Sequence, residues 1–223
     1  METRSTTTCR RSSWNKVNHF WLRVGAMVRQ LDLFCFLGST YTYLTVNRVE
    51  SVTARQGISL RWRPFSVRSI MLEQNNRPFV GKPVKLNYMW RDIERRAMRH
   101  GIPFKGIPDY PNDPDELASR VASLAATEGW CPAFAKAAYA LWFLENKDPG
   151  NVEYLAPLLA RMRKDPEAIV ARANSEQIRA QYETTTDLAR SMGIFGSPTF
   201  ACGKEIFWGD DRLEDAIDWC IAQ

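Results

Sequence analysis

The 223-residue sequence lacks features that mark several large classes of protein. It has no run of 18 or more apolar residues, so no membrane-spanning helix is expected. It has two histidines and no Cys-x-x-Cys pair, so neither a zinc-binding spacing nor a disulfide-exchange motif is recognisable, and no metal site is expected. We expect the five cysteines to be small buried apolar residues in a reducing cytoplasm. They are Cys9, Cys35, Cys131, Cys202 and Cys220.

The main body of the chain also lacks an excess of basic residues. Residues 1–30 hold six basic side chains and one acidic side chain, which accounts for the whole net charge of +5. The remaining residues are neutral overall, so the electrostatic basis for binding nucleic acid is missing. Apolar residues make up 45% of the chain, as in a soluble domain with a substantial core. The length favours one domain that carries an insertion.

The basic N-terminal segment, residues 1–28, is rich in Thr, Ser and Arg. This composition is similar to that of a transit peptide, but Met27 directly before the first predicted strand also suggests a mis-chosen start codon, which we favour. In either case we expect residues 1–28 to be poorly ordered and to take no part in the chemistry.

A β-α-β unit is predicted for residues 31–65. Residues 31–37 form an apolar run that Gly38 closes, which is typical of a buried strand. Ser39 and Thr40 then offer an N-cap for a helix that ends near Gly57. Residues 58–65 alternate between apolar and polar side chains, as in a second strand.

The central segment, residues 66–192, carries helix signals and is predicted to be an all-helical insertion. Residues 68–78 indicate an irregular loop or short helix, and residues 113–116 (Asp-Pro-Asp-Glu) predict the start of a helix. Strand signals return in a hairpin at residues 196–208, before a closing helix. The expected fold is therefore α/β and thioredoxin-like, β-α-β then β-β-α. Its thioredoxin-like domain comprises residues 31–65 and 193–223.

Three segments resemble one known family. Residues 34–44, with Ser-Thr-Tyr-Thr-Tyr-Leu from position 39, resemble the serine-containing loop of 2-hydroxychromene-2-carboxylate isomerases and kappa-class glutathione transferases. Residues 193–200 (Gly-Ile-Phe-Gly-Ser-Pro-Thr-Phe) resemble the cis-proline loop of that family, and residues 205–213 resemble its glutathione-clamping turn. The resemblance covers residues 31–221. Thr40 replaces a proline of the pattern, and Phe36 replaces an acidic residue.

The resemblance implies that Ser39 is catalytic. Its hydroxyl would donate a hydrogen bond to the sulfur of glutathione, whose thiol has an ordinary pKa of about 8.5. The N-terminus of the helix that begins at Thr40 would add further stabilisation of the thiolate. Oxygen in place of sulfur at this position removes disulfide exchange. From residues 37–45 alone, a simple N-cap role for Ser39 is equally consistent.

The resemblance also implies the residues that bind glutathione. The backbone beside a cis Ser197–Pro198 bond would pair with the cysteinyl part, and Asp211 would meet the γ-glutamyl ammonium, with Asp210 next to it. Asn76 and Lys85 would contact the peptide and its glycyl carboxylate. Helix capping by one of the two aspartates, an ordinary loop asparagine and a solvated lysine are the alternatives.

The expected function is that of a glutathione-dependent isomerase acting on a conjugated aromatic ketoacid, in a cytoplasmic homodimer. The alternatives are a kappa-like glutathione transferase, a non-catalytic glutathione-binding module, and a disulfide oxidoreductase that uses Cys35 or Cys202. Several aromatic residues of the insertion could line a substrate pocket, although core packing is favoured. They are Trp90, Trp130, Tyr139, Trp142 and Phe143.

Overall fold

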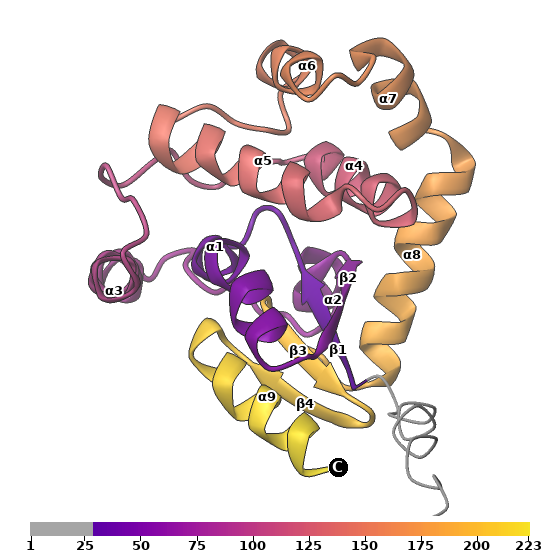
Figure 1. Ribbon diagram of the computed structural model, residues 1–223. Helices are drawn as coiled ribbons and strands as arrows, with labels where there is room; N and C mark the ends of the chain where they lie inside the picture. Colours follow the sequence, from indigo (N-terminus) through magenta and orange to yellow (C-terminus); the bar gives the residue numbers. More distant parts are fainter. Residues whose placement is uncertain (1–28) are drawn as a thin grey trace, which may run out of the picture.

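The structure is a computed structural model that describes residues 29–223 (Figure 1). The predicted leader, residues 1–28, lies outside the described residues. Four strands form one mixed sheet in the order β2-β1-β3-β4. The elements follow the predicted order of β-α-β, a run of helices, and β-β-α, so the expected α/β fold with a helical insertion is confirmed.

The central strand of the sheet is β1 (Gln30–Cys35). It runs parallel to β2 (Ser59–Pro64) and antiparallel to β3 (Thr199–Cys202), which in turn pairs with the edge strand β4 (Glu205–Trp208). Because β1 is covered on both faces, residues 33–37 are all buried. This explains the continuous apolar run in the sequence.

Two helices of the thioredoxin-like part accompany the sheet, α1 (Thr40–Arg55) and α9 (Leu213–Ala222). Helix α1 connects β1 to β2, and α9 packs against β1, β3 and β4 (Figure 1). In the ladder, Leu33 of β1 lies between Trp62 of β2 and Phe200 of β3. All three side chains are buried, which places the core directly beneath the loop that leads into α1.

The segment between β2 and β3 is helical, as predicted. Its helices are α2 (Val67–Glu73), α3 (Pro83–His100), α4 (Leu117–Thr127), α5 (Cys131–Glu145), α6 (Val152–Arg161), α7 (Pro166–Ala173) and α8 (Glu176–Ser191). One buried apolar cluster runs from β1 and α1 into α4 and α5. Tyr139, Trp142 and Phe143 are almost completely buried in it, so the expected packing role of these aromatic residues is confirmed. No helix among residues 29–223 is both long and apolar enough to cross a membrane.

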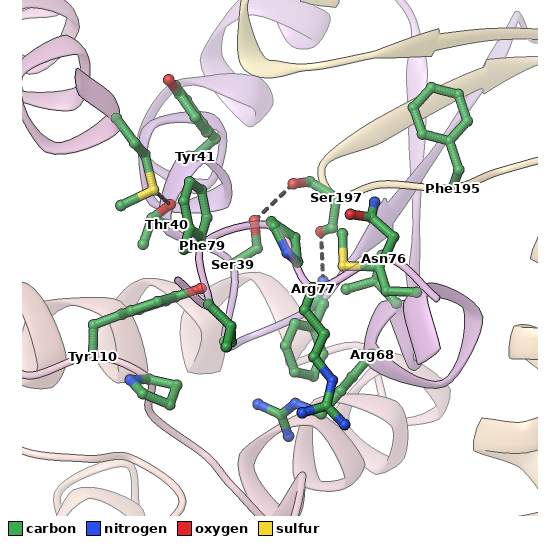
Figure 2. Close-up of a pocket in the computed structure, with 18 of the residues that line it drawn as sticks. Ser39, Thr40, Tyr41, Arg68, Asn76, Arg77, Phe79, Tyr110, Phe195 and Ser197 are labelled. Atoms are coloured by element: carbon green, nitrogen blue, oxygen red, sulfur yellow. Dashed lines mark hydrogen bonds between the residues drawn. The ribbon is translucent and has the colours of Figure 1, made fainter. Parts of the chain in front are cut away.

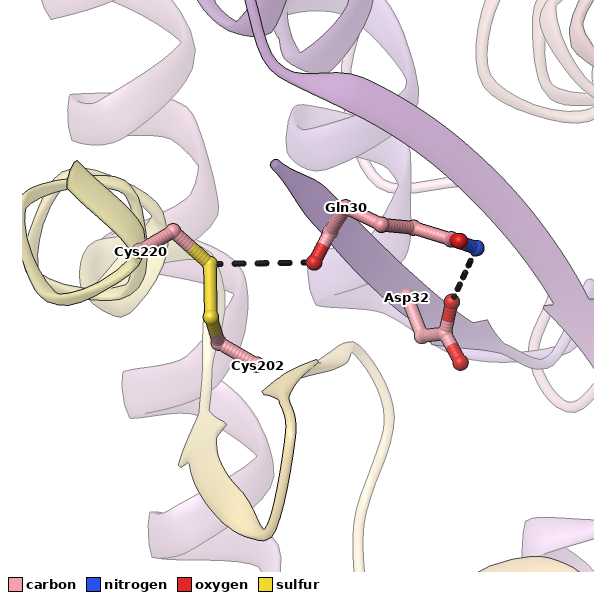
Figure 3. Close-up of a disulfide and its surroundings, with 4 residues drawn as sticks. All are labelled: Gln30, Asp32, Cys202 and Cys220. Atoms are coloured by element: carbon pink, nitrogen blue, oxygen red, sulfur yellow. Dashed lines mark hydrogen bonds between the residues drawn. A yellow bond between two sulfur atoms is a disulfide. The ribbon is translucent and has the colours of Figure 1, made fainter. Parts of the chain in front are cut away.

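The expectation for the cysteines is wrong at two positions. Cys35 and Cys131 are buried and free, as expected, and Cys9 lies outside the described residues. Cys202 and Cys220 instead form a disulfide, with their Cα atoms 5.9 Å apart (Figure 3). The pair is 18 residues apart in sequence and meets only because α9 packs on β3. The inference of a reducing compartment, which assumed free cysteines, therefore loses its support.

The N-terminus of α4 also differs from the prediction. The helix begins at Leu117, four residues after the expected cap, and Asp113 adopts a left-handed backbone with a φ of 47°. The Asp113 carboxylate nevertheless accepts hydrogen bonds from the backbone N–H groups of Ala118 and Ser119, at 2.9 and 3.1 Å. It therefore caps α4 from outside the helix. Such a cap depends on a folded loop, which the short-range sequence pattern does not specify.

The capped end of α4 is joined to the thioredoxin-like part. The Ser119 hydroxyl donates to Asp113 at 2.9 Å and accepts from the backbone N–H of Leu37 at 3.3 Å. Asp113 is completely buried, and burial raises the pKa of its carboxyl to about 6, against the opposing effect of its hydrogen bonds. The carboxylate is thus both an anchor of the insertion and a source of pH-dependent stability.

Stability is expected to fall as the pH rises from 4 to 6. A carboxyl whose pKa is higher in the folded state than in the unfolded state favours folding below about pH 4, and this contribution is lost through pH 6. The change amounts to about 3 kcal/mol, at 1.4 kcal/mol for each pKa unit. Urea denaturation across this range measures it. Asp113→Asn should flatten the profile, whereas replacing the exposed neighbour in Asp115→Asn should not. Parallel slopes for Asp113→Asn and the parent would contradict the assignment.

Candidate functional site

A cavity of about 640 Å³ lies where the thioredoxin-like part meets the insertion (Figure 2). Its walls come from the loop before α1, from α2 and α3 with the chain between them, and from the loops before α4 and β3. Most of the lining is apolar or aromatic, with polar groups at a few points. A largely apolar pocket with a few convergent polar groups is typical of a small-molecule site.

Ser39 lies in this cavity, at the N-cap position of α1. Its backbone is extended, with φ −91° and ψ 126°, as an N-cap requires, but its side chain makes no capping hydrogen bond. The hydroxyl instead donates to the backbone carbonyl of Ser197 at 2.7 Å (Figure 2). The alternative of a simple N-cap therefore describes the backbone of Ser39 and not its hydroxyl.

The loop that carries Ser39 is fixed by hydrogen bonds from other segments. The backbone N–H of Phe36 donates to the Ser197 hydroxyl at 2.9 Å, and the Tyr139 hydroxyl donates toward the carbonyls of Phe36 and Ser39. Gly38 is required in this loop, because a Cβ there would approach the Phe36 ring to 2.5 Å. Ser39 is therefore held in a rigid position at the start of a helix.

The Ser197–Pro198 peptide bond is cis, as predicted. The Ser197 hydroxyl is engaged with Phe36 and, at 2.9 Å, with the hydroxyl of Thr42. Only the backbone carbonyl of Ser197 faces Ser39. Gly196 is needed beside it, because a Cβ at that position would overlap the indole of Trp208. This close approach places Trp208 at the edge of the cavity.

Four of the seven predicted site residues line the same cavity. Ser39, Asn76, Lys85 and Ser197 contribute to its walls from three separate segments. Asn76 and Lys85 are exposed, and the Lys85 ammonium lies 5.8 Å from the centre of the Phe79 ring. Pro198 is adjacent to Ser197 but outside the lining, and so are the two predicted aspartates.

The two aspartates have different environments. Asp210, in the short 3-10 turn Asp210–Arg212 before α9, is completely buried and accepts from Thr45, Arg48 and Arg96. Its carboxylate joins α9 to α1 and α3, which gives Asp210 a structural role, and the predicted contact of Asp210 with glutathione stays a prediction. The oppositely charged partners lie more than 100 residues away in sequence, beyond any local pattern. Asp211 is half-exposed and pairs with Arg212 at 3.7 Å, so it remains available to a ligand.

Sequence patterns missed several lining residues. They include Arg68, Arg77, Tyr110, Phe195 and Trp208. A partly buried arginine in a helix, an exposed arginine in a loop and scattered aromatic side chains give no periodic signal. Their convergence depends on how the insertion folds onto the core.

The electrostatics of the cavity favour an anionic ligand. Its charged lining residues are Arg68, Arg77 and Lys85, and none of the described residues that line it is acidic. Glutathione carries two carboxylates and one ammonium group, so a cationic pocket beside the Ser39 hydroxyl and the N-terminus of α1 fits that tripeptide. Residues 29–223 contain no cluster of three or more His, Cys, Asp or Glu side chains that could hold a metal ion.

Comparisons with known proteins identify relatives that match most of this chain. The chain is 24% identical over 191 residues to 2-hydroxychromene-2-carboxylate isomerase of Sphingobium xenophagum, a match that covers 84% of this chain and 96% of the relative. It is 23% identical to glutathione S-transferase kappa 1 of Caenorhabditis elegans, over 85% of this chain and 89% of that protein. Among solved structures, a selenomethionine 2-hydroxychromene-2-carboxylate isomerase superposes with a TM-score of 0.75 at 23% identity and covers 87% of this chain and 97% of that one.

The match to a family extends over most of the chain. Residues 30–218 fit the DSBA-like thioredoxin domain, from the first residue of β1 into the last helix. The helical segment between β2 and β3 is included in that match. The chain therefore belongs to the DSBA-like thioredoxin domain family.

Proposed function

We propose that this protein is a glutathione-dependent isomerase of a small conjugated aromatic ketoacid, similar in activity to its isomerase relatives. The observation that carries the proposal is the Ser39 hydroxyl, which lies in a cationic pocket at a helix N-terminus and does not cap the helix. When bound, glutathione would supply a thiolate that adds reversibly to a double bond and thereby allows rotation about it. The protein would hold that sulfur ionised and position the second substrate.

Ser39 and the N-terminus of α1 would together lower the pKa of the glutathione thiol. Each pKa unit requires about 1.4 kcal/mol of differential stabilisation. A hydrogen bond to a charged group contributes about 1.5–3 kcal/mol, and a helix terminus about 0.3–1 kcal/mol. The Ser39 hydroxyl must leave the Ser197 carbonyl to reach a sulfur atom, which offsets part of this gain. A net decrease of about one to two pKa units is the expected result.

Disulfide exchange is a poor alternative for this site. Ser39 offers oxygen where an exchanger needs a thiolate. Cys35 is completely buried, and burial raises the pKa of its thiol to about 12, so it is neutral at physiological pH. Cys202 is bonded to Cys220 at the end of β3 away from Ser197. None of these cysteines provides the reactive thiolate that disulfide exchange requires.

A kappa-like glutathione transferase is the second candidate, because named kappa transferases are also relatives. It would use the same thiolate but form a lasting bond to an electrophile. Incubation with glutathione and either 2-hydroxychromene-2-carboxylate or a chloronitrobenzene separates the two activities. Tight glutathione binding with an unchanged thiol pKa, measured by ultraviolet absorbance, would instead indicate a binding module without turnover. The homodimer and the cytoplasmic location stay predictions.

Replacing Ser39 should greatly reduce activity without removing glutathione binding. In Ser39→Ala we expect turnover to decrease by roughly 10²–10³, the scale for losing one donor to an anion at a catalytic centre. The dissociation constant for glutathione should change little, since the peptide contacts remain. Steady-state kinetics and calorimetry measure the two quantities. Ser51→Ala, on the exposed part of α1, is the matched control. Full turnover in Ser39→Ala would move the catalytic role to another residue.

Asp211 should contribute to glutathione affinity and not to the rate at saturation. Asp211→Asn is expected to raise the dissociation constant about fivefold, because an exposed ion pair contributes up to about 1 kcal/mol. Asp215, which also pairs with Arg212, gives the control Asp215→Asn. The same calorimetric titration tests both variants. Identical affinities in the two variants and the parent would exclude Asp211 from the site.

A further inference from the structure

Arg68 of α2 is held at one wall of the cavity by the loop before α4. Its Nη1 donates to the carbonyls of Asp113 and Pro114, at 3.0 and 2.9 Å, and its Nη2 donates to the carbonyl of Asn112 at 3.3 Å. Glu116 lies 3.5 Å from Nη1. These contacts fix the guanidinium from the side of the loop, while 31% of the side chain stays exposed.

The anchoring contacts leave one edge of the Arg68 guanidinium free. A guanidinium has five N–H donors, and within residues 29–223 the Nε–H of Arg68 and one hydrogen on Nη2 have no acceptor. The same edge, formed by Nε and Nη2, donates to carboxylates in two other arginines of the molecule. Arg61 donates to Asp32 through Nε and Nη2 at 2.7 and 2.6 Å, and Arg96 donates to Asp210 through the same two atoms. The free edge therefore has the geometry for a bidentate carboxylate contact.

Tyr110 offers a second unused donor. Its hydroxyl forms no hydrogen bond within residues 29–223 and points into the cavity in Figure 2. Burial raises the pKa of Tyr110, and the positive charge of Arg68 partly opposes this increase. The phenol thus stays protonated at neutral pH and can donate to an anion in the cavity that Arg68 also lines.

Arg68 and Ser39 line the same cavity, so Arg68 can bind the second substrate as well as glutathione. The guanidinium carbon lies 4.9 Å from the centre of the Phe36 ring, and Gly38, next to Ser39, lies close to the edge of the same ring. A carboxylate on Arg68 would therefore lie near Phe36, in the cavity that Ser39 also lines. Lys85 lies on a different helix, α3, with its ammonium 5.8 Å from the centre of the Phe79 ring.

We propose that Arg68, assisted by Tyr110, binds the carboxylate of the second substrate and makes this pocket specific for conjugated aromatic acids over their neutral analogues. This inference rests on the proposed function for the identity of the reaction. The binding of an aromatic acid can be measured without turnover, so the experiment can contradict this inference and the proposed function separately.

The test compares trans-cinnamate with its methyl ester, which has the same ring and double bond but no charge. Calorimetric titration of the full chain should show tighter binding of the acid by at least tenfold. Arg68→Gln should abolish this preference, because it should lower the affinity for the acid and leave the affinity for the ester unchanged. Arg77→Gln, which removes an exposed charge from the same cavity, should change the acid affinity by less than threefold. Glutathione affinity should stay the same in both variants.

Equal losses of affinity for the acid in Arg68→Gln and Arg77→Gln would overturn the assignment, because they would indicate a general effect of positive charge and not a specific contact with Arg68. A loss of glutathione affinity in Arg68→Gln alone would also overturn it and place the peptide's own carboxylate there. If Arg68→Gln melts too early to titrate, Tyr110→Phe decides, since it removes a hydroxyl without a partner. It should weaken acid binding at least threefold, and an unchanged affinity would contradict the proposal. Acid preference without isomerisation would contradict the proposed function alone.

Discussion

The hydrogen bonds between Ser197 and the loop before α1 join segments about 160 residues apart in sequence, and the geometry of the site depends on them. The Ser197 hydroxyl fixes the backbone of Phe36, while its carbonyl receives the hydroxyl of Ser39. Since Thr42 also contacts Ser197, the first turn of α1 is tied to the same point. The helix N-terminus and the serine therefore keep one relative position, which an electrostatic role toward sulfur requires.

The insertion turns this junction into an enclosed pocket. Ser119 of α4 accepts from Leu37, and Asp113 holds Ser119, so the loop of residues 112–114 is placed by the same contacts that anchor the insertion. That loop supplies the carbonyls that orient Arg68. The protonation state of Asp113 and the position of the Arg68 guanidinium are therefore linked through one short segment. Asp210 is also a buried carboxylate that connects separate segments, since it joins the start of α9 to α1 and α3.

The sequence predicts those parts of the fold and site that depend on neighbouring residues. The strand of residues 31–37, the helix that follows Ser39 and the hairpin near Pro198 are local patterns, and the structure contains all three. The resemblance correctly predicts the cis Ser197–Pro198 bond. Contacts between residues far apart in the sequence could not be predicted from it. The partners of Asp210 and the Cys202–Cys220 disulfide, like the inward orientation of Arg68, arise only when separate segments pack together.

The charge of the pocket bears on the choice between the two candidate activities. An electrophile without a charge gains nothing from an arginine whose free edge faces the cavity, and leaving that edge desolvated and unpaired opposes binding. A conjugated acid pairs with the same edge and replaces the water it displaces. Ser39 would not distinguish the two proposed reactions, because each would begin with the same thiolate. Under the proposed function, the discrimination between isomerase and transferase chemistry would therefore depend on the part of the cavity that the insertion contributes, which includes Arg68, and not on the thioredoxin-like part that would ionise the sulfur.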